Sequence, residues 1–348
     1  MLSNLSANTS ELHIFQDKSL DFCAIICLQQ YGRGPALGGC RMLSYASMDV
    51  AVQEAIRLAK AMSYKAALSE LPHDGGKAVI MRSANNIDRH AVLKRFAECV
   101  NSLNGKYITT IDSGTSQADM STLKKHTSFV TGYLAGDNTE NDPSISTALG
   151  IFKGMQAAVK LTYGHDNLAE LPIAIQGVGN VGYHLAKLLY QAGAQLTICD
   201  INQSRALQCA AECAATVVAP SAIYAVPCVI FSPCALGQIL NSLTVPQLKA
   251  RIIAGAANDQ LSSPDQADAL AARGILYVPD YLINAGGLIH LSLQQKTPQY
   301  IPREIARIAQ RIFTLAEEAK LQQKTLFAMA EAMAEVRLSA NSKTNCEK

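Results

Sequence analysis

The chain has 348 residues, which suggests about two domains at one domain per roughly 150 residues. Hydrophobic residues make up 49% of it and charged residues 17%, which excludes an intrinsically disordered chain; no Gly-X-Y or heptad pattern indicates a fibrous one. The formal net charge is +2, so no overall electrostatic field favours nucleic acid or a membrane surface as a partner.

The N-terminal part begins with strand and helix patterns in mixed order. Residues 22–28 form a continuous apolar run of strand length, and over residues 50–66 apolar side chains recur at helical spacing. Ser47 and Asp49 stand where a helix cap and a first-turn acid belong. This part of the chain therefore predicts a buried strand followed by an amphipathic helix.

Breakers and polar residues then divide the chain. Pro72 and the Gly75-Gly76 pair predict a loop, and residues 77–81 predict a buried strand after it. The segment 136–146 is polar and rich in turn residues, which is typical of a linker between domains.

Beyond this linker, short apolar runs alternate with helical patterns. The runs are residues 172–176, 195–199, 216–219, 228–231, 252–254 and 275–278. Short buried strands that alternate with helices are typical of a parallel, doubly wound sheet. Amphipathic helices at about 302–320 and 325–338 and a polar tail complete the predicted α/β fold.

No apolar run approaches the ~18 residues of a membrane-spanning helix, and the first residues lack the pattern of a signal peptide. We therefore expect a cytoplasmic protein that binds neither membrane nor nucleic acid. The ten cysteines include no CxxC pair. Cys23 and Cys27, like Cys209 and Cys213, lie in apolar segments without further ligands at short spacing, so we expect reduced cysteines and no metal.

The segment PIAIQGVGNVG, residues 172–182, contains a GxGxxG motif between a predicted strand and a predicted helix. Gly177 suits a tight turn, Gly179 lets the backbone approach a pyrophosphate, and Gly182 permits close packing of helix and strand. The next predicted strand ends at Asp200, which can bind a ribose and repel a 2′-phosphate. The motif predicts a Rossmann-type domain that prefers NAD to NADP; the alternative is a glycine turn near an unrelated acid.

Two lysines flank the predicted loop. Lys65 lies near the end of the predicted helix and Lys77 opens the predicted strand, so we expect both to reach one cleft between the domains. Most lysines lie on a solvated surface, which is how Lys60 and Lys94 are interpreted. Lys77 precedes an apolar run, where desolvation lowers the pKa of a lysine and lets it act as a base.

Longer motifs follow one another along the chain. They are 35–42 (PALGGCRM), 62–66 (MSYKA), 75–80 (GGKAVI), 112–115 (DSGT), 176–181 (QGVGNV), 233–237 (PCALG), 254–258 (AGAAN) and 279–287 (PDYLINAGG). Together they resemble the Glu/Leu/Phe/Val family of amino acid dehydrogenases, most closely its leucine dehydrogenase branch. The resemblance implies a catalytic and oligomerisation domain at 1–140, on which the C-terminal helices can pack, an NAD-binding Rossmann domain at 141–325, and a C-terminal helix and tail at 326–348.

The activity that the resemblance implies is reversible, NAD-dependent oxidative deamination of an L-amino acid to a 2-oxo acid and ammonium by a homo-oligomer. Lys77 resembles the base that activates water, and Asp112 resembles the acid that exchanges protons with the amino group. Lys65 resembles the lysine that binds the substrate carboxylate, beside Gly38 and Gly39.

Further residues resemble the family's binding positions. Thr147, Asn258 and Asn284 match residues near the nicotinamide, and Leu288 and Leu291 match the wall of the side-chain pocket. The other cofactor-binding residues that the motifs imply are Gly177, Val178, Gly179, Asn180, Val181, Gly182, Asp200, Cys234, Ala235 and Ala256.

Some positions depart from the family pattern. Asp74 replaces a glycine three residues before Lys77, Ile111 replaces the acid before Asp112, and Asp259 replaces an asparagine. We expect Asp74 either to raise the pKa of Lys77 or to face water and shape the turn. The leading hypothesis is a branched-chain amino acid dehydrogenase. The alternatives are the same chemistry on an aromatic or other amino acid, and a weakened NAD-binding paralogue with a regulatory role.

Overall fold

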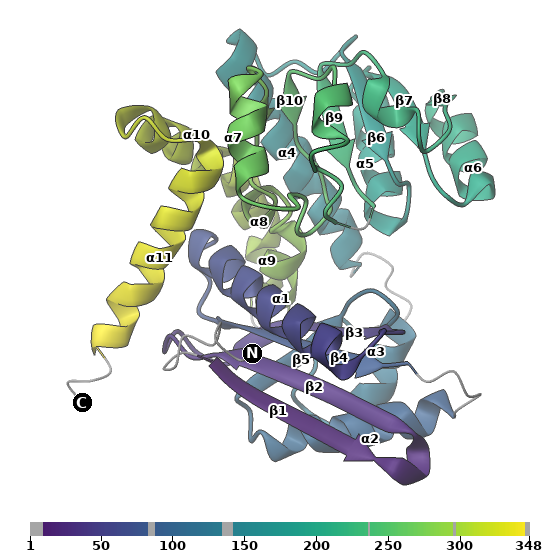
Figure 1. Ribbon diagram of the computed structural model, residues 1–348, viewed down its shortest axis with the longest axis vertical. Helices are drawn as coiled ribbons and strands as arrows, with labels where there is room; N and C mark the ends of the chain where they lie inside the picture. The colour runs from purple at the N-terminus through teal and green to yellow at the C-terminus, as the bar shows by residue number, and fades with distance from the viewer. Residues whose placement is uncertain (1–9, 83–87, 134–141, 236, 295–296, 345–348) are drawn as a thin grey trace. The chain divides into compact units, whose positions relative to one another are not determined.

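The computed structural model describes residues 10–82, 88–133, 142–235, 237–294 and 297–344 (Figure 1). The chain divides into two compact units. Unit 1 comprises the residues up to Asp142 together with those from Ala334 onward, and unit 2 comprises Pro143–Met333. Residues 136–141 of the expected linker lie outside the described residues, whereas its last residues begin helix α4 (Pro143–Tyr163).

Unit 1 contains a mixed five-stranded sheet in the order β1-β2-β4-β3-β5. Its strands are β1 (Ser10–Asp17), β2 (Phe22–Gln29), β3 (Ala36–Leu43), β4 (Asp74–Met81) and β5 (Tyr107–Ile111). Strand β3 runs parallel to β4 and β5, whereas β2 is antiparallel to β1 and β4. The helices are η1 (Lys18–Leu20), α1 (Met48–Leu68), α2 (Arg89–Ser102) and α3 (Gln117–Lys124).

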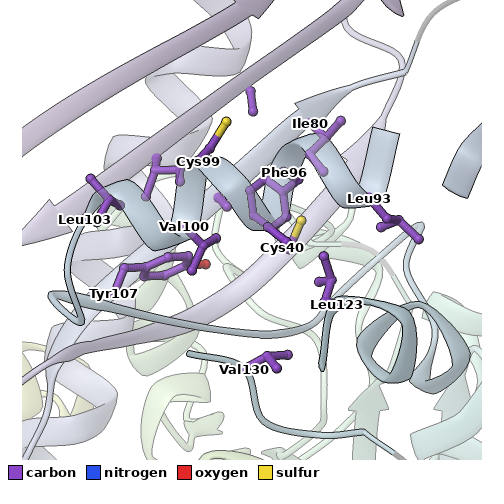
Figure 2. Packing of buried hydrophobic residues seen from close by; sticks show 14 of the residues in the cluster. Cys40, Ile80, Leu93, Phe96, Cys99, Val100, Leu103, Tyr107, Leu123 and Val130 are labelled. Carbon is purple, nitrogen blue, oxygen red and sulfur yellow. The ribbon is translucent and has the colours of Figure 1, made fainter. Parts of the chain in front are cut away.

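The two faces of this sheet are covered by different helices (Figure 1). Ile25 and Val79 pack with the apolar side of α1. Figure 2 shows the core of the other face, where Phe96 of α2 lies among Ile80 and Tyr107 from the strands. Because side chains alternate along a strand, the odd-numbered residues of β4 face α1 and the even-numbered ones face α2.

Strand β4 begins at Asp74, so Gly75 and Gly76 lie inside the strand and the predicted loop at these residues is wrong. A Cβ at Gly75 would lie 2.2 Å from the carbonyl oxygen of Ala59 in α1, and a Cβ at Gly76 would lie 2.8 Å from the ring of Tyr107. The glycines are needed for close packing on both faces of the strand, and a rule that interprets glycine pairs as turns misplaces this boundary.

Unit 2 contains a parallel six-stranded sheet in the order β11-β10-β9-β6-β7-β8. Its strands are β6 (Pro172–Gln176), β7 (Gln195–Cys199), β8 (Thr216–Val217), β9 (Ile230–Pro233), β10 (Ile252–Ile253) and β11 (Leu276–Tyr277). All six predicted strands are present, and the predicted doubly wound sheet is confirmed. The strand order reverses between β6 and β9, and such sheets bind ligands outside the carboxyl ends of the strands at this point.

The remaining helices cover or follow this sheet. They are α4, α5 (Asn180–Gln191), α6 (Gln203–Cys213), η3 (Ile223–Ala225), η4 (Val245–Gln247), α7 (Asp265–Ala272), α8 (Asp280–Ile283), α9 (Gly286–Leu293), η5 (Pro298–Tyr300), α10 (Ile301–Leu321) and α11 (Leu326–Thr344). The predicted amphipathic helices at 302–320 and 325–338 correspond to α10 and α11. None of the helices in the described part of the chain is long and apolar enough to cross a membrane.

Candidate active site

A cluster of charged side chains lies on the face of the unit 1 sheet that α1 covers. Strand β3 contributes Arg41, β4 contributes Lys77, the end of β5 contributes Asp112, and α1 contributes Glu54 and Lys65. Lys77 Nζ forms an ion pair with Asp112 Oδ2, and Arg41 Nη2 lies 3.4 Å from Asp112 Oδ1. Arg41 Nη1 also pairs with Glu54. We call these five residues the charged cluster.

Burial sets the chemistry of Lys77, which is only 3% exposed. Burial lowers the pKa of Lys77 well below its usual range, and the positive charges of Arg41 and Lys65 lower it further. The negative charge of Glu54 acts in the opposite direction. The environment of Lys77 therefore disfavours its ammonium form and raises the share of neutral amine, which is the form that can accept a proton.

The loop after β5 holds Asp112 in place. The backbone N–H of Ser113 donates to Asp112 Oδ1 at 2.5 Å, and the Thr115 hydroxyl accepts from the backbone N–H of Asp112 at 3.0 Å. The same hydroxyl donates to the carbonyl oxygen of Cys40 in β3 at 2.9 Å. Gly114 has φ +83°, and a Cβ there would lie 1.9 Å from the carbonyl oxygen of Met42. The DSGT motif thus fastens the aspartate to the neighbouring strand.

Gly38 and Gly39 give the space that this arrangement needs. A Cβ at Gly39 would lie 2.7 Å from Asp112 Cβ and 2.8 Å from Asp112 Oδ2. A Cβ at Gly38 would lie 1.6 Å from the carbonyl oxygen of Gly76 in β4. The expected substrate-binding glycines therefore lie beside Asp112 and between adjacent strands, on the same strand as Arg41.

Two departures from the family pattern lie on the other face of the sheet. Asp74 is 4% exposed, and its Oδ2 accepts the backbone N–H groups of Tyr31 and Gly32, both at 3.0 Å. Ile111 packs against the core that α2 covers. Asp74 does shape a turn, but its carboxylate is buried and does not face water. Because side chains alternate along β4, Asp74 and Lys77 lie on opposite faces of the sheet. The expectation that Asp74 stabilises the ammonium form of Lys77 is therefore wrong.

In unit 2, the glycine-rich segment joins β6 to α5 at the point where the strand order reverses. Gly177 has φ +92°, and a Cβ there would lie 2.9 Å from the backbone nitrogen of Ala235, in the loop after β9. A Cβ at Gly182 would lie 2.1 Å from the carbonyl oxygen of Gly177. Among the described residues, and apart from its chain neighbours, a Cβ at Gly179 would meet no heavy atom within 4 Å, so these residues leave space for a ligand above this turn. Asn180 and Val181 form the first turn of α5, whose N-terminus attracts anions.

Asp200 follows β7 and links two loops. Its Oδ2 accepts the backbone N–H of Val178 and its Oδ1 accepts that of Asn202, both at 2.8 Å. Each carboxylate oxygen can accept a second hydrogen bond. The backbone N–H of Cys234 donates to the carbonyl oxygen of Gln176 at 2.8 Å, so the loop after β9 lies beside the glycine-rich turn.

The residues expected near the nicotinamide form two contacts within unit 2. Asn284 Nδ2 donates to Asn258 Oδ1 and to the carbonyl oxygen of Ala256, both at 3.0 Å. Thr147 Oγ1 donates to a backbone carbonyl at the start of α4 at 2.8 Å, and a Cβ at Gly287 would lie 2.5 Å from this hydroxyl. Segments far apart in the chain therefore meet here.

Leu288 and Leu291 lie one turn apart on α9 and are 5% and 9% exposed. His290, between them, bonds through Nδ1 to Ser146 Oγ at 2.8 Å, which links α9 to the first turn of α4. Both leucines thus lie on a helix that a side-chain hydrogen bond connects to the start of α4.

The sequence did not assign roles to Arg41 and Glu54. Arg41 lies within the 35–42 motif, and its position between the core residues Cys40 and Met42 is the signal that could have identified it as a buried charge. Among the described residues, no group of His, Cys, Asp and Glu could hold a metal ion.

Both units match known protein families. Residues 11–129 match the model of the Glu/Leu/Phe/Val dehydrogenase dimerisation domain, and residues 197–344 match that of glutamate/leucine/phenylalanine/valine dehydrogenase. The chain is 41% identical over 330 residues to a leucine dehydrogenase of Geobacillus stearothermophilus, covering 94% of this chain and 90% of the relative. It is 39% identical over 330 residues to a phenylalanine dehydrogenase of Bacillus thermotolerans, covering 92% and 86%. The crystal structure of L-tryptophan dehydrogenase from Nostoc punctiforme matches with a TM-score of 0.78 at 37% identity, covering 96% of each chain.

Proposed function

The chain belongs to the Glu/Leu/Phe/Val dehydrogenase family, and we propose that this amino acid dehydrogenase acts on a branched-chain L-amino acid with NAD. The reaction would be reversible oxidative deamination to the 2-oxo acid, ammonium and NADH. The observation that carries the proposal is the buried Lys77–Asp112 pair, in a chain 41% identical to a leucine dehydrogenase.

The cofactor part of the proposal rests on the residues around the switch point of unit 2. The open space at Gly179 and the N-terminus of α5 fit a pyrophosphate, and Asp200 fits a ribose with two free hydroxyls. A 2′-phosphate would meet the Asp200 carboxylate, which is the reason to propose NAD and not NADP. Thr147, Asn258 and Asn284 are proposed to lie near the nicotinamide. NAD, when bound, accepts the hydride.

The substrate part rests on the charged cluster. Lys65, which is 8% exposed, would bind the substrate carboxylate, and Gly38 and Gly39 leave room beside Asp112. Asp112 would take a proton from the substrate ammonium, so that the α-carbon bearing a neutral amine can lose its hydride. Lys77 would then remove a proton from water as the oxygen adds to the C=N carbon. Return of protons to the nitrogen releases ammonium and leaves the 2-oxo acid.

Aromatic amino acids are the second candidate substrates, since relatives named as phenylalanine and L-tryptophan dehydrogenases are 39% and 37% identical to this chain. Leu288 and Leu291 favour a smaller substrate, because leucines at positions that resemble the pocket wall would narrow it. A homo-oligomer is proposed because residues 11–129 match a domain described as a dimerisation domain.

The test is NADH formation by the purified full-length chain with a panel of L-amino acids at several pH values. We expect leucine, valine and isoleucine to be oxidised with the highest kcat/KM. A clear preference for phenylalanine or tryptophan would support the second candidate. Absence of NADH formation with every L-amino acid would contradict the proposal and favour a paralogue that only binds NAD.

A further inference from the structure

Two members of the charged cluster have no part in the chemistry above. Arg41 lies on β3, next to β4 in the sheet, and its side chain is 11% exposed. Its Nη1 pairs with Glu54 of α1, and its Nη2 lies 3.4 Å from Asp112 Oδ1. The other oxygen of Asp112 pairs with Lys77. The guanidinium therefore joins α1 to the carboxylate that holds the proposed base.

Packing alone does not explain this arginine. A buried guanidinium loses its hydration and is tolerated when carboxylates compensate it, whereas an apolar side chain would fill the same place on a buried strand at no such cost. Cys40 and Met42, its neighbours on β3, are core residues of the opposite face. Arg41 is thus a charge directed to the face of the sheet that holds Lys77.

We propose that Arg41 and Glu54 are positioning residues of this dehydrogenase: Glu54 holds the guanidinium of Arg41, and Arg41 holds Asp112 against Lys77 while adding positive charge around the substrate. The inference rests on the proposed function. With both residues included, the charged cluster has three basic side chains and two carboxylates, so its net charge depends on the protonation of Lys77.

The groups that face Lys77 come from every element packed around it. Arg41 and Lys65 are cations that disfavour its ammonium form, whereas the Glu54 carboxylate favours it. Burial raises the pKa of the Cys40 thiol far above its usual value, so Cys40 carries no charge at neutral pH. The Asp112 carboxylate is its ion-pair partner, and Cys27 of β2 lies opposite Lys77 in the sheet register. Burial raises the pKa of Cys27 to about 11, so this thiol carries no charge at neutral pH. Removal of Arg41 and removal of Glu54 should therefore change the protonation of Lys77 in opposite directions.

The experiment compares pH profiles of kcat/KM for L-leucine oxidation with NAD in three full-length proteins. Because Lys77 acts as a neutral base, kcat/KM rises with pH through the pKa of Lys77. Arg41→Gln should move this acid limb to higher pH and lower kcat by about 10- to 100-fold, since Asp112 loses a partner that orients it. Glu54→Gln should move the acid limb to lower pH. Arg41→Lys keeps the charge and should restore the position of the limb and part of kcat.

The matched control is Arg57→Gln, which removes the same charge from an exposed position of α1. Its acid limb should stay at the wild-type position. The inference would be overturned if the acid limb of kcat/KM stays in place in both Arg41→Gln and Glu54→Gln, or if it moves in the same direction in both. If Arg41→Gln does not fold, Glu54→Gln decides alone, because only a shift to lower pH agrees with the proposal.

A second measurement separates this inference from the proposed function. NMR titration of enzyme labelled at lysine Cε, with Lys77→Arg to assign the signal, reports the protonation of Lys77 without turnover. We expect the Lys77 signal to titrate with a midpoint at lower pH in Glu54→Gln than in the wild type, and at higher pH in Arg41→Gln. If the wild type is inactive but the three Lys77 midpoints follow this order, only the proposed function is contradicted. If the wild type is active but the midpoints do not follow this order, only the inference is contradicted.

Discussion

A lysine can act as a base near neutral pH only where its surroundings disfavour the ammonium form. Lys77 meets this condition through burial and through two neighbouring cations, Arg41 and Lys65. The compensating carboxylate, Asp112, is fixed by the loop that follows β5. In the proposed reaction, Lys77 would activate water as a neutral amine and the Asp112 carboxylate would exchange protons with the amino group, which are the two proton carriers that oxidative deamination requires.

At Asp200, the wild type should prefer NAD to NADP, because a 2′-phosphate would meet a carboxylate. Asp200→Ser should lower the ratio of kcat/KM with NAD to kcat/KM with NADP by about 10-fold or more, since hydrogen bonds to a charged group contribute about 1.5–3 kcal/mol. The measurement is kcat/KM for both cofactors in both proteins. A wild type that uses NADP as well as NAD would show that Asp200 only holds the backbone of Val178 and Asn202.

At Asp74, the buried carboxylate is an acceptor for two backbone N–H groups. Asp74→Gly should reduce the free energy of unfolding by about 1–3 kcal/mol, because the N–H groups of Tyr31 and Gly32 lose their acceptor. It should leave the acid limb of the kcat/KM profile unchanged, because Asp74 and Lys77 lie on opposite faces. A shifted limb would show that the two groups interact.

Asp74→Asn provides the matched control for that experiment, because it keeps an acceptor and removes the charge. Burial raises the pKa of Asp74 above its usual value. An acid whose pKa is raised in the folded state binds its proton more readily there, so stability is lost as pH rises through that pKa. The unfolding free energy of Asp74→Asn should therefore depend less on pH than that of the wild type. Urea unfolding at several pH values measures this difference.

Leu288 and Leu291 should decide the size of the accepted side chain. In the wild type we expect valine and 2-aminobutyrate to rival leucine, and Leu291→Val should favour leucine by about 10-fold, since one methylene contributes about 1–3 kcal/mol to discrimination. The measurement is kcat/KM for a series of L-amino acids of increasing size. A wild-type preference for phenylalanine would mean that other residues form the pocket wall.

The sequence could predict the strands that contain a continuous apolar run and the helices whose apolar residues recur at helical spacing. Strand β2, helix α1 with its Ser47 cap, and the strands of unit 2 are examples. Strand β3 contains Gly38 and Gly39, and the second and third residues of β4 are a glycine pair, so local propensity indicates loops where tertiary packing requires strands. The pattern singles out Lys65 and Lys77, and the family motif adds Asp112. Neither could give the pairing of Lys77 with Asp112, because strand register and the contact of α1 with the sheet are set by distant residues.

The C-terminal part of α11 stabilises the element that carries Lys65. Arg337 Nη1 donates to the carbonyl oxygens of Ala67 and Leu68, at 3.1 and 3.2 Å, in the last turn of α1. Helix ends leave such carbonyls without partners inside the helix, and a cation there also interacts favourably with the helix dipole. The residues from Ala334 onward thus contact the helix that carries Lys65, the residue proposed to bind the substrate carboxylate.

Arg337→Ala should therefore lower the free energy of unfolding by about 1–2 kcal/mol. It should raise KM for the amino acid more than it lowers kcat, because the removed contacts lie two or three residues after Lys65. Val336→Ala is the control, since Val336 is 67% exposed on the same helix. Equal kinetics in both variants would show that the Arg337 contacts do not influence Lys65.

At the scale of the whole molecule, the two units divide the proposed tasks between them. Unit 1 contains the charged cluster, and unit 2 contains the glycine-rich turn, Asp200 and the residues proposed to lie near the nicotinamide. The two-domain α/β organisation could be predicted because alternating strands and helices leave few other arrangements. The resemblance also allows the C-terminal helices to pack on the first domain, but it does not give the residue at which the chain returns to unit 1, because that depends on contacts such as that of Arg337 with α1.

The role of Lys77 as the base is tested most directly by turnover and NADH binding of the Lys77→Ala variant. Lys77 belongs to unit 1 and the dinucleotide residues belong to unit 2. Loss of the base should lower kcat for leucine oxidation by about 10²- to 10⁴-fold, while the Kd for NADH, measured by fluorescence titration, stays near the wild-type value. Turnover near the wild-type rate in Lys77→Ala would contradict the central claim that this buried lysine is the base.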